Sequence, residues 1–273
     1  MSVVSPGRTV GDLLRQWRHQ RRMSQLDLAV EADVSARHLS FVETGRSRPS
    51  RELVLHLAEH LDVPLRDRNT LLMAAGFAPT YPETPFDADE MAPVRDALDR
   101  ILTSHQPFPA VVVDRHWNLV SANQTALTIL SDGVDPELLG PHANALRVCL
   151  HPDGLAPRIV NLAQYSAHLI ERLDRLAAAS ADPELLSLRD ELRRYPGVAE
   201  GHPGGSDTAS RLFVPLVLRD RERGGDRSGD GGHLTFFSTI ATFGTAHDIT
   251  VAELAIESFF PADKHTSAVL NGL

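Results

Sequence analysis

The residues best suited by type and spacing to do chemistry lie in SARHLSFVETGRSRPSR, residues 35–51. Ser35 is a good N-cap, because its hydroxyl can accept a hydrogen bond from a free amide of the first helical turn. Leu39 and Val42 fall on one apolar face of that helix, which leaves hydrogen-bond donors on its other faces. Gly45 can end the helix in a left-handed conformation, and the cations that follow it are Arg46, Arg48 and Arg51. This pattern also fits an ordinary solvated helix, but a short helix with outer donors and cations at its exit suits the major groove of DNA.

Catalytic and metal-binding patterns are poorly represented elsewhere in the chain. Among the 13 histidines, His142 and His151 lie near Cys149 in the sequence, but their spacing matches no structural zinc site. The glycine-rich stretch 202–206 lacks the Gly-Lys-Ser/Thr ending of a phosphate loop, and the sequence has no nucleophile elbow. We therefore expect no metal site, no catalytic residue and no cofactor.

Length and composition indicate about two domains with packed cores. The 273 residues are 42% hydrophobic, which suits roughly two globular domains. The single cysteine rules out an intrachain disulfide, and this favours a reducing compartment. The first 20 residues contain no apolar core of signal-peptide length, and no apolar run approaches the roughly 20 residues that span a bilayer. We expect a cytoplasmic protein without membrane partners.

The net charge of −9 is unevenly distributed along the chain. Residues 1–78 hold 11 arginines and 9 acidic residues, a charge of +2, whereas the remainder holds 16 basic and 27 acidic residues, a charge of −11. A local basic surface is sufficient to meet phosphates, wherever the acidic residues lie. Contact with nucleic acid is therefore expected from the first 78 residues.

Apolar periodicity and capping residues predict five short helices in residues 1–77. The first helix has a recurring apolar face formed by Val10, Leu13, Leu14 and Trp17. Serines at N-cap positions open the next three helices: Ser24, Ser35 and Ser50. Pro64 stands where a fifth helix begins, a position that tolerates a missing N–H, and Gly76 ends it. The prediction is a compact all-α domain.

The string SQLDLAVEADVSARHLSFVETGRSRPS resembles the XRE/Cro-type helix-turn-helix of bacterial repressors. The resemblance covers about residues 10–75, where helix lengths, the turn and the glycine after the third helix agree. It implies that the residue at the position of Gln25 contacts phosphate from a helix N-terminus, whose free amides attract anions. Family members often carry Gln where this chain has Ala36 and Phe41, so the DNA sequence that it reads must differ. The implied recognition surface comprises Gln25, Ser35, Ala36, Arg37, His38, Ser40, Phe41, Arg46, Ser47 and Arg48.

Roles within this recognition surface follow from side-chain chemistry. Arg37 is the best candidate for base readout, because a guanidinium can hydrogen-bond guanine O6 and N7 together. Phe41 is expected either to contact a thymine methyl or to be covered by the adjoining domain. Phosphate contacts, which fix register without reading sequence, are expected from Ser40, Arg46, Ser47 and Arg48. By the same resemblance, Glu43 is expected to turn inward and pair with Arg18.

The rest of the chain predicts a linker and a mixed domain. Residues 78–93 hold four prolines and four acidic residues, which predicts a linker or extended strap. Helix resumes near Val94, and the stretches VVVD and NLVSA predict two strands joined by a turn. A helix is expected from Asn123 through Leu130. Strand, turn, strand and helix in this order are typical of the opening of a PAS-type fold.

The remaining residues alternate between helical and strand patterns. Residues 145–195 are expected to be helical, including an amphipathic stretch from Ile159 to Leu176. Two strands are expected within 211–220 and 233–243, separated by a charged, glycine-rich loop over 221–232. Val251 to Phe260 is expected to form a closing helix. The predicted fold is α+β: a five-helix domain followed, over residues 94–273, by a PAS-like domain with an antiparallel sheet.

The stretches VVVDRHWNLVSAN, LRVCLHPDGLAPRIVNL and STIATFGTAHDITVAELAIESFFPAD resemble the MmyB-like ligand-binding domain that is often fused to XRE-type regulators. The resemblance covers about residues 95–265 and implies a fatty-acid-like or other apolar small molecule held between sheet and helices. Candidate lining residues are Trp117, Leu127, Phe213, Leu216, Phe236 and Phe237. Arg158 or His151 is the candidate partner of a carboxylate head group. Each of these also fits a plain core or surface residue.

These patterns lead to one preferred hypothesis and two alternatives. The preferred one is a transcription regulator, a repressor, that binds a double-stranded DNA operator as a homodimer and responds to an apolar effector. The first alternative is an enzyme with an active site near His151 and Asp153, in which the helix-turn-helix serves autoregulation. The second is a C-terminal domain that only dimerises and binds no ligand.

Overall fold

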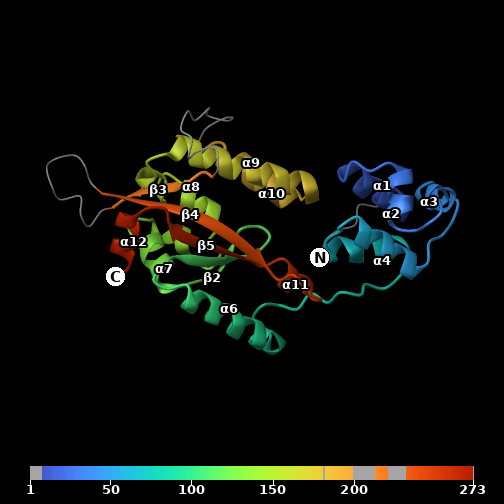
Figure 1. Cartoon of the computed structure of the whole chain (residues 1–273), viewed down its shortest axis with the longest axis horizontal. Coiled ribbons are helices and arrows are strands. Elements are labelled where there is room, and N and C mark those ends of the chain that lie inside the picture. The colour runs from blue at the N-terminus through green and yellow to red at the C-terminus, as the bar shows by residue number, and fades with distance from the viewer. Residues whose placement is uncertain (1–7, 181, 199–212, 221–231, 273) are drawn as a thin grey trace. The chain divides into compact units, whose positions relative to one another are not determined.

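The computed structural model describes residues 8–180, 182–198, 213–220 and 232–272 (Figure 1). Within these ranges the chain forms two compact units. The N-terminal unit comprises residues up to Ala88 together with Gly244–Ala252, and the C-terminal unit comprises Asp89–Phe243 together with the residues from Glu253 onwards. Most of the predicted loop over 221–232 lies outside the described residues.

The N-terminal unit begins with five helices, as the sequence predicts. They are α1 (Val10–Gln20), α2 (Gln25–Glu31), α3 (Ala36–Glu43), α4 (Arg51–His60) and α5 (Leu65–Ala74). The side chains of Ser24, Ser35 and Ser50 each accept a hydrogen bond from the first turn of the helix that they precede, so all three predicted caps are confirmed. The apolar faces of the helices meet in one core that includes Leu14, Leu28, Leu39, Val54, Leu57 and Leu71.

The proline-rich segment after α5 packs against that helix. The buried side chain of Asn69 in α5 donates to the carbonyl oxygen of Tyr81 (2.8 Å) and accepts from the amide of Thr80 (2.8 Å). The segment in turn holds the short helix α11 (Ile249–Ala252), since the amide of Ile249 donates to the carbonyl oxygen of Pro82 (2.8 Å). Thr84 also donates to Asp248 through its amide and its hydroxyl, at 3.1 and 2.7 Å.

The C-terminal unit is built on a five-stranded antiparallel sheet of order β2-β1-β5-β4-β3 (Figure 1). Its strands are β1 (Ala110–Val113), β2 (Leu119–Ala122), β3 (Leu216–Arg219), β4 (His233–Thr242) and β5 (Ala255–Pro261). The strand expectations for VVVD, NLVSA and the two later stretches are confirmed. Together with the helical N-terminal unit, this confirms the predicted α+β fold.

The prediction of a closing helix from Val251 to Phe260 is wrong. Within that stretch only Val251 and Ala252, the last two residues of α11, are helical, and β5 occupies the centre of the sheet, paired with β1 on one side and β4 on the other. The apolar positions of this stretch fit a helical period, but two neighbouring strands satisfy its backbone hydrogen bonds along its length. Tertiary pairing therefore overrides the local pattern.

Helices pack around this sheet to complete the C-terminal core. They are α6 (Ala92–Ser104), α7 (Gln124–Ser131), α8 (Ala145–Leu150), α9 (Leu162–Ser180), α10 (Pro183–Leu192) and α12 (Lys264–Leu270). Three short 3-10 helices cover Asp89–Met91, Pro136–Leu139 and Ala156–Arg158. The amphipathic helix expected from Ile159 to Leu176 begins three residues later and continues to Ser180. Helices α9 and α10 lie side by side (Figure 1).

Candidate DNA interface and ligand cavity

Helices α2 and α3 form the helix-turn-helix of the N-terminal unit. The turn between them contains Asp33 at a positive φ of 49°, and the amide of Val34 donates to the carbonyl oxygen of Ala29 (2.9 Å). Leu39 and Val42 bury the inner face of α3, as their spacing predicts. The outer face of α3 is thereby turned to solvent.

A glycine that the sequence reading overlooked lets α1 approach the end of α3. A Cβ atom at Gly11 would lie 2.5 Å from the carbonyl oxygen of Val42 and 2.7 Å from that of Glu43. These are backbone atoms, so any side chain at this position would force the two helices apart. Gly11 therefore helps to set the position of the recognition helix. The only sign of this close approach in the sequence was a glycine directly after Val10, the first apolar residue of α1.

A buried ionic cluster ties α3 to α1 and α2. The guanidinium of Arg18 donates to both carboxylate oxygens of Glu43, at 2.7 and 2.8 Å, and the side-chain amide of Gln25 donates to Glu43 Oε2 at 2.7 Å. The expected inward pairing of Glu43 with Arg18 is confirmed. Burial by itself would raise the pKa of Glu43, but the hydrogen bonds from Arg18 and Gln25 and the charges of Arg18 and Arg15 leave that pKa below its usual value.

The same cluster holds the side chain of Gln25, the residue to which the resemblance to XRE/Cro-type repressors assigns a phosphate contact. The amide nitrogen of Gln25 points to Glu43 and to no other described residue. A phosphate contact at this position would therefore use the backbone amides of the first turn of α2, which lack partners within the helix, or the side-chain NH2 group of Gln25 after a change of rotamer releases it from Glu43. Gln25 serves first to hold α2 against α3.

The outer face of α3 presents the predicted reading residues. Ala36, Arg37 and His38 are exposed, and Ser40 and Phe41 are half-buried. The guanidinium carbon of Arg37 lies 5.3 Å from the centre of the Phe41 ring, within the range of a cation–π contact. This contact restricts the arginine to one side of the helix while leaving its donors in solvent. Phe41 thus has a supporting role that its sequence position did not indicate.

The loop after α3 is ordered by backbone hydrogen bonds and displays further cations. Gly45 takes a positive φ of 71°, which confirms its predicted role in ending the helix. The amides of Arg46 and Ser47 both donate to the carbonyl oxygen of Phe41, at 2.8 and 3.1 Å. The side chains of Arg46 and Arg48 are exposed. Neither they nor Arg37 form an ion pair with any residue that the structure describes, so their charges face solvent.

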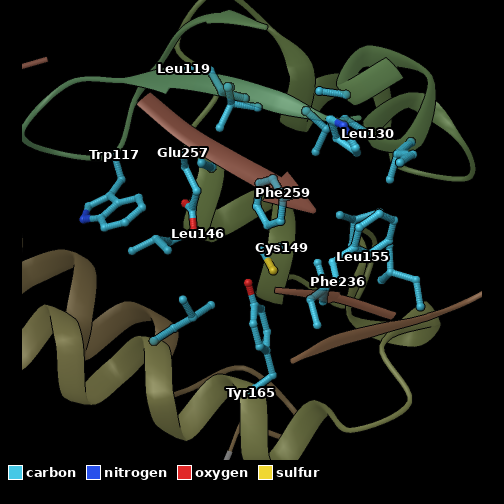
Figure 2. Close-up of a pocket in the computed structure, with 18 residues that line it drawn as sticks. Trp117, Leu119, Leu130, Leu146, Cys149, Leu155, Tyr165, Phe236, Glu257 and Phe259 are labelled. Carbon is cyan, nitrogen blue, oxygen red and sulfur yellow. The ribbon is translucent and has the colours of Figure 1, made fainter. Parts of the chain in front are cut away.

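The C-terminal unit encloses an apolar cavity between the sheet and its helices (Figure 2). The side chains around it come from all five strands and from α7, α8 and α9, and include Trp117, Leu119, Leu146, Leu155, Leu216 and Phe236. Its volume is about 80 Å³, below the roughly 300–1,000 Å³ of most small-molecule sites. An occupant must therefore be small, or must displace lining side chains.

Three groups with polar atoms interrupt the apolar lining. They are Tyr165 of α9, Cys149 of α8 and Glu257 of β5 (Figure 2). Burial raises the pKa of the Cys149 thiol to about 12 and the pKa of Tyr165 well above its usual value. Burial also raises the pKa of Glu257, although a hydrogen bond from Ser238 and the charge of Arg172 oppose that shift. None of the three was predicted to line a cavity, and the only signal for Glu257 was an acid within the apolar run AIESFF.

Only some of the residues that were predicted to hold a ligand line the cavity. Trp117, Leu216 and Phe236 line the cavity, whereas Leu127, His151, Arg158, Phe213 and Phe237 do not. Leu127 and Phe213 are 49% and 45% exposed. Phe213 and Phe237 instead contact each other, with ring centres 5.8 Å apart.

The two candidate partners of a head group make other contacts. The guanidinium of Arg158 donates to the carbonyl oxygens of Ile129 and Asp132 and forms an ion pair with the Asp132 carboxylate at 3.1 Å. His151 lies 3.7 Å from the carboxylate of Asp153, and its ring meets that of Tyr195 edge to face. Neither side chain lines the cavity. The described residues contain no cluster of three or more side chains suited to a metal ion.

Comparison with known proteins agrees with both parts of this architecture. A family model for a helix-turn-helix domain matches residues 9–71. A family model described as the MmyB-like transcription regulator ligand binding domain matches residues 94–273. A search of curated proteins finds no match. None of the helices in the described ranges is long and apolar enough to cross a membrane. A helix-turn-helix with a solvent-facing α3, followed by this ligand-binding domain, makes the chain a DNA-binding transcription regulator that belongs to the MmyB-like family.

Proposed function

We propose that the protein represses transcription by binding an operator as a homodimer, and that an apolar small molecule in the cavity changes the affinity of the dimer for DNA. One observation carries the DNA half: three arginines around α3, Arg37, Arg46 and Arg48, face solvent without an ion-pair partner among the described residues. The almost wholly apolar cavity of the C-terminal unit carries the effector half.

The proposed DNA contacts of α3 are of two kinds: some read the bases, and others position the protein on the DNA backbone. Arg37 lies on the outer face with Ala36 and His38, and its guanidinium reads a guanine through O6 and N7. Phe41 supports that arginine and offers its free edge to a thymine methyl. Backbone contacts come from the exit of the helix, through Ser40, Arg46, Ser47 and Arg48. Ser35 caps the helix with its hydroxyl at 3.0 Å from the amide of His38.

Dimerisation and ligand binding supply the regulatory step. Two copies of α3 reach successive major grooves when they lie about one helical turn apart on the DNA. A ligand alters operator affinity only to the extent that it binds one arrangement of the dimer more tightly than the other. The effector must therefore distinguish a DNA-competent dimer from an incompetent one.

The DNA half is tested with two arginine variants. Bound fragments selected from a random DNA pool supply the operator, and fluorescence anisotropy measures affinity at fixed salt. Arg37→Ala should lose about 1–3 kcal/mol on the operator and relax one base position, whereas Arg48→Ala should weaken all sequences alike and flatten the salt dependence. Arg100→Ala, which removes an exposed arginine of the C-terminal unit, is the control. Equal losses on operator and random DNA for Arg37→Ala would refute the assignment.

The effector half is tested with the same operator. Selection and anisotropy are repeated in the presence of lipid extract from the host, and mass spectrometry identifies any molecule that copurifies with the protein. A shift of operator affinity at stoichiometric ligand supports the proposal. Unchanged affinity with a ligand demonstrably bound would remove the sensing role and leave a constitutive DNA-binding protein.

A further inference from the structure

Glu257 occupies an unusual place for an acidic side chain. It lies on the central strand β5, opposite Val111 of β1 and Ile240 of β4. Its side chain reaches the apolar cavity (Figure 2), and the residue is only 6% exposed. Acidic residues are almost never buried to this extent unless they are paired, so the contacts of this carboxyl group are informative.

The contacts of Glu257 satisfy one of its two oxygens. The hydroxyl of Ser238 donates to Oε1 at 2.8 Å, and the guanidinium of Arg172 lies 3.9 Å from the same oxygen. Within the described part of the chain, Oε2 receives no hydrogen bond. Arg172 is also held by Trp117, whose ring centre lies 4.4 Å from the guanidinium carbon. One carboxyl oxygen is therefore available to an occupant of the cavity.

A second polar group meets the same space from the opposite wall. Tyr165 rises from α9 with its hydroxyl directed into the cavity, towards the side from which Glu257 descends (Figure 2). The residue is 6% exposed, and its hydroxyl forms no hydrogen bond with any described residue. A buried phenol without a partner is costly. The cavity thus pairs an available acceptor with an available donor in an otherwise apolar lining.

The acidity of Glu257 limits what can bind between these groups. A carboxylate ligand would place a second acid beside Glu257, and two neighbouring carboxyl groups cannot both ionise without a penalty. A neutral hydroxyl group has no such conflict, since it can donate one hydrogen bond and accept another. Its O–H can donate to Glu257 Oε2 while its oxygen accepts from the Tyr165 hydroxyl.

We infer that the cavity selects an apolar molecule that bears one neutral hydroxyl group, in preference to the carboxylic acid of the same chain, and that Glu257 and Tyr165 bind that hydroxyl. This inference rests on the proposed ligand-binding function. It replaces the expected pairing of a head group with Arg158 or His151, which lie outside the lining. The polar end of the ligand is recognised by an acid and a phenol rather than by a cation.

Three eight-carbon probes test this preference: 1-octanol, octanoate and octane, each at pH 7.5. Trp117 lines the cavity, so its fluorescence reports binding to the full-length protein in a Trp17→Phe background. The unmodified cavity should bind 1-octanol at least about tenfold more tightly than octanoate, and more tightly than octane. Displacement of a fluorescent apolar dye provides an independent readout.

Two variants and one matched control complete the test. Glu257→Gln should strengthen octanoate binding at least about fivefold, because it removes the acid that competes with a second carboxyl group. It should also weaken 1-octanol binding by about two- to fivefold, because an amide replaces the carboxyl group that accepts from the hydroxyl. Tyr165→Phe should weaken 1-octanol about fivefold and leave octane unchanged. Tyr195→Phe removes a phenol that donates to Glu191 at 2.6 Å outside the cavity, and it should change none of the three affinities.

The outcomes separate this inference from the proposed function. Equal binding of all three probes would overturn the hydroxyl preference while supporting a ligand cavity. Tighter binding of octanoate than of 1-octanol, or an octanoate affinity unchanged by Glu257→Gln, would also overturn it. If no probe binds by either readout, the proposed ligand-binding function fails and this inference fails with it.

Discussion

Replacing Glu43 with alanine should destabilise the N-terminal unit severely. The substitution removes both hydrogen bonds from Arg18 and the one from Gln25. The guanidinium of Arg18 keeps its bond to the carbonyl oxygen of Met23 (2.9 Å) but loses its counter-charge while remaining buried. Removing one partner of a buried ion pair typically costs about 3–5 kcal/mol, a large part of the roughly 5–15 kcal/mol that stabilises a domain.

Tryptophan fluorescence allows this unit to be followed separately. The chain has two tryptophans: Trp17, which is buried in the N-terminal core, and Trp117, which is buried in the other unit. In a Trp117→Phe background, Trp17 reports urea unfolding of the helix-turn-helix unit. With a slope near 2 kcal/mol per molar urea, Glu43→Ala should lower the midpoint by about 2 M. Glu59→Ala, which removes an exposed carboxylate of α4, should change it by less than about 0.3 M.

A double variant tests the reasoning behind this magnitude. If the loss comes from an uncompensated buried charge, replacing both partners with apolar residues should be far less damaging than removing one. Arg18→Met combined with Glu43→Leu should therefore recover much of the stability lost in Glu43→Ala. A shift below about 0.3 M for Glu43→Ala, or a double variant as unstable as that single one, would show that the cluster does not determine the stability of α3.

Three further predictions concern the pH dependence of stability, the reactivity of Cys149 and the buried side chain of Asn123. Because the folded pKa of Glu43 is lowered from 4.5, its contribution is complete above about pH 4.5 and is lost as the pH falls through the folded pKa; Glu43→Gln should therefore flatten the acid side of the Trp17 stability profile. Cys149, whose pKa burial raises to about 12, should react with iodoacetamide at pH 8 far more slowly than after unfolding, and a ligand in the cavity should slow it further. An unchanged rate on denaturation would contradict this. Asn123→Ala should lower the stability of the C-terminal unit by at least about 3 kcal/mol, measured by Trp117 fluorescence. The substitution leaves four backbone groups without their hydrogen-bond partner: the amides of Ala110 and Ala126 and the carbonyl oxygens of Leu102 and Phe108. A loss below about 1 kcal/mol would contradict this prediction.

Local signals were sufficient for the helix-turn-helix. The serine caps, the spacing of Leu39 and Val42, and the glycine at position 45 each act over one or two turns, so a linear sequence displays them fully. The inward turn of Glu43 was predicted from a resemblance. The engagement of Gln25 by Glu43 was not, because it depends on how α2 crosses the end of α3.

The cavity was harder to anticipate than the reading helix. Its lining comes from strands and helices distant in the sequence, and the aromatic residues proposed for it were selected by type alone. Trp117 and Phe236 reach the interior, whereas Phe237 follows Phe236 on the same strand and projects from the other face, as successive strand residues do. Because residues 251–260 were predicted to form a helix, the position of Glu257 on a central strand could not be anticipated.

The connection between β4 and β5 has a practical consequence for dissecting this protein. Residues 244–252 lie between two strands of the sheet, yet they pack with the first 88 residues through Thr84, Pro82 and α5. No single cut along the chain therefore yields two intact halves. A fragment ending near Ala88 would expose the surface that Ile249 covers, and one starting at Val94 would carry Ile249 and Asp248 without their partners. Fragment experiments require either the full chain or a redesigned hairpin that replaces 244–252 with a short turn.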